Sequence, residues 1–176
     1  MRAIETGLAG AVVVEPTPAT DERGFFARTW CARTFAAWGL DPALTQCSVS
    51  FNHRRGTLRG MHYQADPHGE AKLVRCTRGA IFDVIVDVRP GSPTYGRWFG
   101  AELTPDNHLG LFIPTGFAHG FQTLADDSEV FYQISVEYVA AAARGIRHDD
   151  PAIGIVWPLP VAVISERDRA LPVLGA

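Results

Sequence analysis

Hydrophobic and polar residues alternate along much of this chain with the period of two that is typical of β-strands. In residues 80–88 (AIFDVIVDV) the even-numbered residues are all apolar, and the odd-numbered ones alternate between isoleucine and aspartate. Residues 129–138 (EVFYQISVEY) alternate in the same way, which places Tyr132 and Tyr138 on the same face as Ile134. Both segments are therefore predicted to be strands with two distinct faces.

Short turn-forming sequences separate the predicted strands at close intervals. They lie at 77–79 (TRG), 89–96 (RPGSPTYG), 104–108 (TPDNH), 114–116 (PTG) and 125–128 (ADDS). This recurrence predicts an all-β sandwich, jelly roll or barrel. One helix is predicted within residues 30–40 (WCARTFAAWGL), and a second, short one at Ser165.

Length and charge limit the classes of protein that fit. The chain has 176 residues, 47% of them hydrophobic, and its mean hydropathy is near zero. These values predict one domain over residues 1–176 with a sizeable core. The formal net charge is −3, and like charges form no long run, which argues against a nucleic acid or an anionic membrane as the main partner.

The cysteines and the N-terminal segment indicate the compartment. Cys31, Cys47 and Cys76 are odd in number and form no CxxC pair, which suits a reducing compartment better than a disulfide framework. Residues 8–14 (LAGAVVV) are too few for a membrane span and follow Glu5 rather than a basic region, so they are predicted to be a strand and not a signal peptide. The expectation is a soluble, cytoplasmic protein.

Polar side chains gather in residues 56–75 (GTLRGMHYQADPHGEAKLVR), which raises the possibility of a metal site. Metal-binding cupins resemble the pattern G-x5-H-x-H-x3/4-E followed later by P-x-G-x2-H, and His62 and His119 match its first and last histidines. Gln64 stands in place of the second histidine, and Glu70 is out of step with the carboxylate. Because two histidines and an amide make a poor metal site, proton transfer is the functional interpretation that remains.

Three residues suit proton transfer next to a carbonyl group. Histidine has an ordinary pKa near neutrality, and tyrosine can supply a proton from the opposite side of a substrate, so His62 and Tyr132 are a candidate base and acid. Lys72 shares a strand face with Val74, so its ammonium group is predicted to point inward, where it would stabilise an enolate. Taken singly, each residue is more often structural: a core histidine, a core tyrosine or a lysine at a strand end.

Two further residues depend on local structure. Arg59 lies on the opposite strand face from His62, so both side chains reach one cavity only if Gly60 makes a bulge or bend. Residues 165–168 (SERD) have the form of a capping box, which by itself makes Asp168 a helix-start residue.

Seven segments, in order over almost the whole chain, resemble the dTDP-4-dehydrorhamnose 3,5-epimerase family. They are DERGFF (21–26), GTLRGMHYQ (56–64), KLVRCTRGAIFDVIVDVRPGSPTYGRW (72–98), IPTGFAHGFQTL (113–124), FYQ (131–133), RGIRHDDPAIGIVWP (144–158) and SERD (165–168). The resemblance implies a cupin-type jelly roll, usually a homodimer, that uses no metal or organic cofactor. It also implies epimerisation of a nucleotide-linked 4-keto-6-deoxyhexose at C3 and C5.

The resemblance assigns a role to each candidate residue. It implies that His62 is the base, that Asp168 orients its imidazole, that Tyr132 is the acid and that Lys72 favours the enolate. The positions implied to bind the nucleotide sugar are Arg23, Phe26, Gln46, Arg59, His119, Tyr138 and Arg167. The guanidinium groups of the arginines among them suit the diphosphate, which each can bind through two parallel hydrogen bonds. N-terminal elements of the family pair across the dimer, so a neighbouring subunit is expected to complete the site.

Several positions depart from the family pattern. Arg28 replaces a glutamate, Ser48 an asparagine, Ala143 another glutamate and His148 a tryptophan. The positions of the first three face the nucleotide in the family, so the reaction type is better specified than the nucleotide. Epimerisation at C3 alone stays open as an alternative, as do a metal-dependent cupin enzyme and a cupin that binds nucleotide sugars without turnover.

Overall fold

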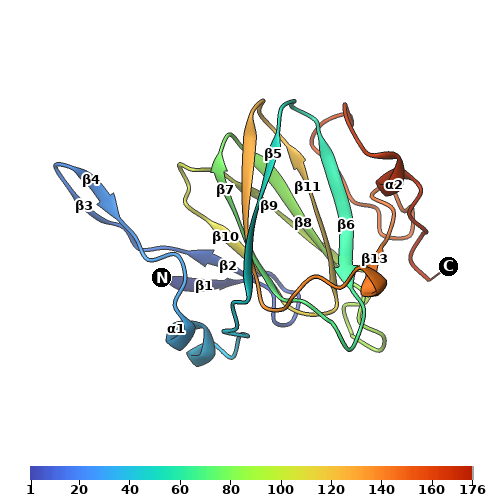
Figure 1. The fold of residues 1–176 in the computed structure, drawn as a ribbon, viewed down its shortest axis with the longest axis horizontal. Coiled ribbons are helices and arrows are strands. Elements are labelled where there is room, and N and C mark those ends of the chain that lie inside the picture. The colour runs from blue at the N-terminus through green and yellow to red at the C-terminus, as the bar shows by residue number, and fades with distance from the viewer. Residues whose placement is uncertain (176) are drawn as a thin grey trace.

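Two facing β-sheets form the body of the computed structural model, which describes residues 1–175 (Figure 1). In sheet order, the first consists of β1 (Arg2–Glu5), β2 (Val12–Glu15), β10 (Gly110–Ile113), β7 (Lys72–Arg78), β12 (Ser128–Ile134) and β5 (Gln46–Asn52). The second consists of β13 (Ala143–Gly145), β6 (Leu58–Gln64), β11 (Phe117–Thr123), β8 (Ile81–Asp87) and β9 (Trp98–Leu103). The prediction of an all-β jelly roll is confirmed. Ala176, the last residue of the predicted domain, lies outside the described residues.

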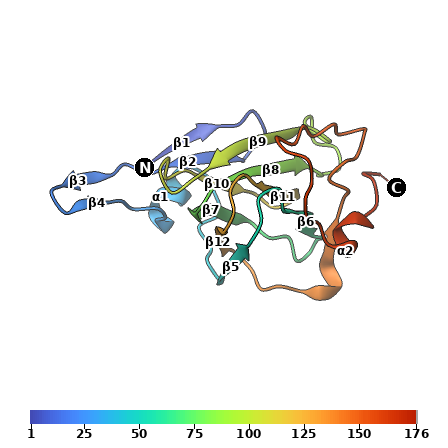
Figure 2. The same ribbon diagram turned by 90° about the horizontal axis from the view of Figure 1, so that it is seen from above.

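A hairpin near the N-terminus extends away from the two sheets (Figures 1 and 2). It consists of β3 (Ala19–Asp21) and β4 (Gly24–Phe26), which pair only with each other, and we call residues 19–26 the arm. Phe25 and Phe26 on it are 55% and 77% exposed. Phe25 contacts His108 of the main body, with 4.5 Å between ring centroids. Two-stranded hairpins are only marginally stable in water by themselves, so exposed aromatic side chains on the arm are an unusual feature.

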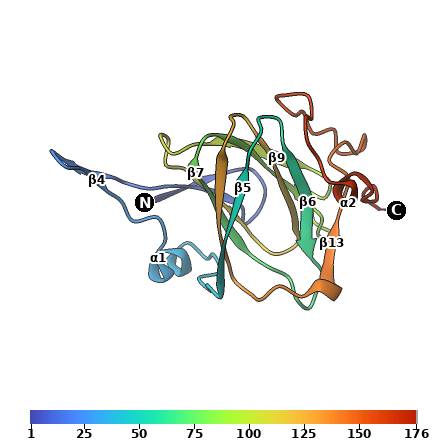
Figure 3. The ribbon, with the colours of Figure 1, turned by 45° about the horizontal axis from the view of Figure 1, so that its top comes forward.

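The outer face of the five-stranded sheet is covered by the chain that follows β13. Val84 and Val86 of β8 pack there against Ile146 and Ile153. The segment ends near helix α2 (Glu166–Arg169), which lies beside β6 and β13 (Figure 3). Both faces of β8 are therefore buried.

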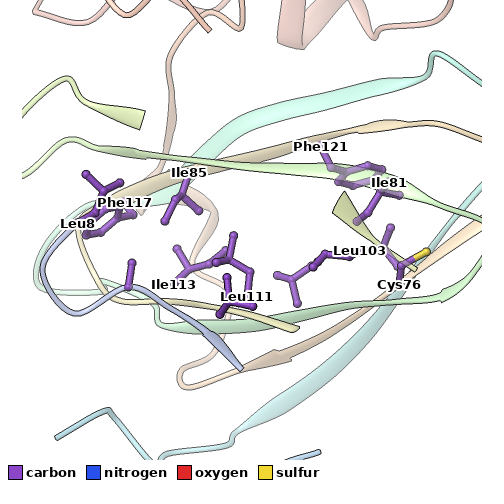
Figure 4. Packing of buried hydrophobic residues seen from close by; sticks show 13 residues of the cluster. Leu8, Cys76, Ile81, Ile85, Leu103, Leu111, Ile113, Phe117 and Phe121 are labelled. Carbon is purple, nitrogen blue, oxygen red and sulfur yellow. The ribbon is translucent and has the colours of Figure 1, made fainter. Parts of the chain in front are cut away.

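The main core lies between the two sheets (Figure 4). Val74 and Leu111 of the six-stranded sheet meet Ile85 and Phe121 of the five-stranded one. The alternation of isoleucine with aspartate in β8 brings two carboxylates onto this inward face. One of them, Asp87, is fully buried at the end of the strand.

The buried carboxylate of Asp87 is hydrogen-bonded by residues of the loop that follows it. Its carboxylate accepts hydrogen bonds from the guanidinium of Arg89 at 2.7 Å and from the hydroxyls of Ser92 and Thr94 at 2.6 Å each. Burial alone would raise the pKa of Asp87, but these hydrogen bonds together hold it well below its usual range. This carboxylate therefore organises the turn after β8 and is not available for proton transfer.

The outer face of the six-stranded sheet is covered on one half only. The predicted first helix is confirmed as α1 (Ala32–Ala37), whose Phe35 is fully buried and packs against Phe112 of β10 with 5.6 Å between ring centroids. On the other half, Val49 of β5 is 58% exposed. The Nε of Arg75 on β7 is buried there with no hydrogen-bond acceptor among residues 1–175.

Two strand predictions were too long. In residues 8–14 the strand begins only at Val12, because the N–H of Ala11 turns back to the carbonyl of Leu8 at 3.0 Å. β12 ends at Ile134, because the next residue, Ser135, leaves the ladder and bonds the backbone of Ala71 through both its N–H and its hydroxyl. Tyr138 therefore lies beyond the strand and is 57% exposed.

The remaining global expectations concern cysteines and membrane spans. Cys31, Cys47 and Cys76 are all free thiols. Within residues 1–175, no helix has both the length and the apolar character needed to cross a membrane.

Candidate active site

Two adjoining chambers open between the sheets. The first has a volume of about 390 Å³ and is bounded by residues of β5, β6, β7, β12 and β13. The second, of about 380 Å³, lies next to α2. The residues that line both chambers are His62, His119, Tyr132 and Arg167. The candidate base and the candidate acid thus face the same space from opposite sheets.

Asp168 holds His62 in place. The Nε2 atom of His62 lies 2.8 Å from Oδ1 of Asp168, and the other carboxylate oxygen accepts a hydrogen bond from the N–H of Gly60 at 3.1 Å. Asp168 is 5% exposed, and its own N–H donates to the hydroxyl of Ser165 at 3.0 Å. The predicted cap at Ser165 is confirmed, and the same helical turn delivers the carboxylate to the imidazole.

The environment of His62 favours the neutral imidazole that a base requires. Burial lowers the pKa of His62 below its ordinary value of 6.5, and the nearby Asp168 carboxylate opposes that shift. Because Nε2 faces Asp168, Nδ1 is the nitrogen left for a substrate proton. The side chain keeps 41% of its surface exposed, so it can exchange protons with solvent.

A bulge in β6 brings Arg59 and His62 into the same chamber. His62 pairs with His119 and Arg59 pairs with Phe121, so three steps along β6 match two along β11. Gly60 occupies the bulge with φ +126, and a Cβ atom there would lie 2.5 Å from the Cα of Gly120. The conditional expectation of a bulge at this glycine is confirmed, and it is what allows side chains of opposite parity to meet.

Tyr132 faces His62 from the other sheet. Burial raises the pKa of its phenol well above the ordinary value of 10.0, the carboxylate of Asp83 raises it further, and the positive charge of Arg59 acts in the opposite direction. The hydroxyl is therefore protonated at neutral pH. It can act as a proton donor to the chamber that it lines.

Lys72 points inward, as predicted, and has a partner that the sequence did not reveal. Its ammonium lies 2.7 Å from the carboxylate of Glu70, and both side chains are 9% exposed. Both line the first chamber. The sequence pattern indicates only that Glu70 is out of step with a metal ligand, whereas in the structure its carboxylate binds the ammonium of Lys72 on the cavity wall.

A second histidine–carboxylate pair was also missed. Nε2 of His119 lies 2.7 Å from Oδ1 of Asp83, which is fully buried, and the other oxygen of Asp83 has no hydrogen-bond partner among residues 1–175. The His119 ring meets the Tyr132 ring edge to face, with 5.9 Å between centroids. The alternation of aspartate with isoleucine on one face of the predicted strand was the signal that could have identified it.

The residues expected to bind the nucleotide sugar fall into two groups. Those that line one or both chambers are Gln46, Arg59, His119, Tyr138 and Arg167. Arg23 and Phe26 lie instead on the arm, where Arg23 pairs with Asp21 at 2.5 Å. Of the departures from the family pattern, Ser48 and Ala143 line the first chamber.

Gln64 has a structural task. Its side-chain nitrogen donates to the carbonyls of His68 at 3.1 Å and Glu137 at 3.2 Å, and its oxygen accepts from the N–H of Val139 at 2.6 Å. The amide thereby fixes the loop after β12. In the described part of the chain, no three His, Cys, Asp or Glu side chains come together in a group that could hold a metal ion.

Comparison with known proteins finds the family that the sequence motifs resemble, over nearly the full length of this chain. The family model described as dTDP-4-dehydrorhamnose 3,5-epimerase matches residues 5–175. A dTDP-4-dehydrorhamnose 3,5-epimerase of Sinorhizobium fredii is 45% identical over 168 residues, which cover 95% of this chain and 86% of the relative.

Solved structures of similar proteins have the same fold. The dTDP-4-dehydrorhamnose 3,5-epimerase of Bacillus anthracis, solved with TDP and PPi bound, has a TM-score of 0.94 at 39% identity, covering 98% of this chain and 99% of that one. A dTDP-6-deoxy-D-glucose-3,5-epimerase of Legionella pneumophila, in complex with dTDP-4-keto-L-rhamnose, has a TM-score of 0.92 at 36% identity, covering 98% and 92%. The cupin-type jelly roll is therefore confirmed.

Proposed function

The chain belongs to the dTDP-4-dehydrorhamnose 3,5-epimerase family, and we propose that His62, Tyr132 and Lys72 carry out its reaction in the chambers between the two sheets. The enzyme is an isomerase that converts dTDP-4-dehydro-6-deoxy-D-glucose into dTDP-4-dehydro-L-rhamnose by inverting C3 and C5. The observation that carries the assignment of roles is that His62, held by the buried Asp168, and Tyr132 line the same space from opposite sheets.

The C4 carbonyl acidifies the hydrogens at C3 and C5, so each inversion begins with removal of a proton. Nδ1 of His62 accepts it, and the electron pair of the C–H bond moves into an enolate with its negative charge on O4. The ammonium of Lys72 stabilises that charge. The hydroxyl of Tyr132 then donates its proton to the opposite face of the same carbon, and the carbonyl re-forms.

His62 and Tyr132 must return to their original protonation states before the second carbon reacts. After one inversion His62 carries the extra proton and Tyr132 lacks one. The exposed edge of His62 allows its proton to leave to solvent, and the raised pKa of Tyr132 makes the phenolate take up a proton readily. Acceptor, donor and stabilising cation are all side chains, so we propose that the reaction needs neither a metal nor an organic cofactor.

Deuterium incorporation tests the reaction directly. Incubation of dTDP-4-keto-6-deoxyglucose with the enzyme in D2O is expected to introduce two deuterons, at C3 and C5, because both C–H bonds are broken and both protons exchange with solvent. Mass spectrometry counts the deuterons and proton NMR locates them, after subtraction of a protein-free control. One deuteron, at C3 alone, would instead support a 3-epimerase, and none would support a nucleotide-sugar-binding protein without turnover.

We further propose that one catalytic domain spans residues 1–176, acts in the cytoplasm without nucleic-acid or membrane partners, and forms a homodimer. Arg23 and Phe26 are exposed on the arm, away from the chambers of their own chain. The half-uncovered sheet face around Val49 and Arg75 supplies apolar surface and a buried donor that finds no acceptor in the described part of the chain. A second copy would cover that face, and its arm would bring Arg23 and Phe26 to the nucleotide.

Mixed dimers test whether the arm crosses to the partner. A His62→Ala chain and an Arg23→Ala/Phe26→Ala chain should each show low activity alone. If each site combines one chain's barrel with the other chain's arm, a mixed dimer contains one intact site, and co-expressed, doubly tagged protein should recover about half the wild-type activity per dimer. If each arm serves its own chain, both sites of the mixed dimer stay defective and no activity returns.

A further inference from the structure

Asn52 is a buried amide at the end of β5 that touches a residue of the second chamber. It is 2% exposed. Its Oδ1 accepts a hydrogen bond from Nε of Arg59 at 2.7 Å. Its Nδ2 donates to the carbonyls of Ser50 at 3.2 Å and Ser128 at 3.3 Å, and to the hydroxyl of Ser50 at 3.4 Å. A polar side chain buried this deeply contributes through those partners.

The two carbonyls and the guanidinium fix the orientation of the amide, whereas the Ser50 hydroxyl can donate or accept. Turned by 180°, the oxygen of Asn52 would face the two carbonyls of Ser50 and Ser128, and its NH2 group would face the guanidinium of Arg59. Acceptor would meet acceptor and donor would meet donor. The strand backbone therefore aims the Asn52 oxygen at Arg59.

This contact determines which part of Arg59 is left for a ligand. With Nε bound to Asn52, the four N–H groups on the two terminal nitrogens have no acceptor among residues 1–175, and Arg59 lines the second chamber. Arg167 lines the same chamber. Two terminal guanidinium nitrogens side by side match two oxygens of one phosphate group.

We propose that Asn52 is a positioning residue for substrate binding, which holds Arg59 by its Nε so that both terminal nitrogens meet the diphosphate of the nucleotide sugar. The inference rests on the proposed function, in which Arg59 binds the diphosphate. Without Asn52 the guanidinium would lose a charge-assisted hydrogen bond and its fixed rotation about the side-chain axis. The diphosphate would then have to order the arginine as it binds.

A double-mutant cycle on dTDP binding tests this role. We expect Asn52→Ala to weaken dTDP binding by about tenfold, the effect of a hydrogen bond to a charged group, and Arg59→Ala to weaken it by on the order of 30-fold. The double variant should bind dTDP no more weakly than Arg59→Ala, because Asn52 acts only through that arginine. Isothermal titration calorimetry gives all four dissociation constants, and steady-state kinetics should show a raised KM with little change in kcat.

Controls separate positioning from general damage. The side chain of Asn107 makes three hydrogen bonds, in an exposed turn away from the chambers, and Asn107→Ala should leave dTDP binding unchanged. If Asn52→Ala does not fold, Asn52→Ser, whose shorter side chain cannot reach Arg59, should show the same loss. The positioning role is overturned if Asn52→Ala binds dTDP normally, or if it still costs tenfold in the Arg59→Ala background. Normal binding by Arg59→Ala alone would instead reject the diphosphate role of Arg59, and with it the premise.

Discussion

Replacing His62 with alanine is expected to lower kcat by about 10²–10⁴-fold, the usual loss when a positioned general base is removed. His119, the other histidine among the described residues that line both chambers, is bound to the fully buried Asp83, and its side chain is only 5% exposed, so it is not open to solvent as His62 is. Both deuterons should disappear from the product in D2O together, because the same imidazole serves C3 and C5. Retention of either deuteron at the wild-type rate would contradict a single base.

A matched control is available for this variant. His53 also lies near a carboxylate, with Nδ1 4.0 Å from Asp127, but its side chain is 84% exposed and it lines neither chamber. His53→Ala should therefore keep wild-type kcat. Equal losses in the two variants would indicate damage to the protein in place of a missing base.

The pH profile of the wild-type enzyme provides an independent check on His62. The base is active when it is neutral, and burial lowers its pKa below 6.5. The decrease of kcat/KM on the acid side of the pH profile (the acid limb) should therefore have its midpoint below pH 6.5. In Asp168→Asn the carboxylate that opposes the shift is absent, so the limb should move to still lower pH while kcat decreases. A limb unchanged in that variant would show that another group titrates.

Replacing Tyr132 with phenylalanine is expected to have a comparably large effect, about 10²–10⁴ on the rate of inversion, but a different isotopic signature. His62 can still form the enolate, and its exposed edge lets it take up a deuteron from D2O and return it to the original face. Deuterium should therefore enter at C3 or C5 with retained configuration. The ratio of exchange to inversion, measured by proton NMR of recovered substrate, should rise well above the wild-type value.

Tyr95→Phe is the control for the loss of a hydroxyl group. Tyr95 is 45% exposed and lines neither chamber, so this variant should invert both carbons at the wild-type rate. Loss of exchange and inversion together in Tyr132→Phe would make Tyr132 part of the enolisation step and not only the acid.

The contacts around Lys72 and His119 show how far spacing along the chain can lead. The alternation in β7 predicted correctly that Lys72 points inward. It could not show that Glu70, two residues earlier and just outside the strand, turns its carboxylate to the same ammonium. Nor could it pair His119 with Asp83, because the register between β11 and β8 sets that contact across 36 positions of the sequence.

The sequence by itself determined the strand alternation, the short helices and the bulge glycine at position 60. Through motifs spread over the chain it also predicted His62 as the base, Tyr132 as the acid and Asp168 as the residue that orients His62. These features depend on the periodicity of apolar residues, on the conformational range of glycine and on side-chain chemistry, all of which can be read from the sequence. Only the tertiary structure decided that Glu70 pairs with Lys72, that Asp83 pairs with His119 and that Asn52 holds Arg59. Those contacts join residues of different strands and loops, and they exist only when both sheets have formed in a single register.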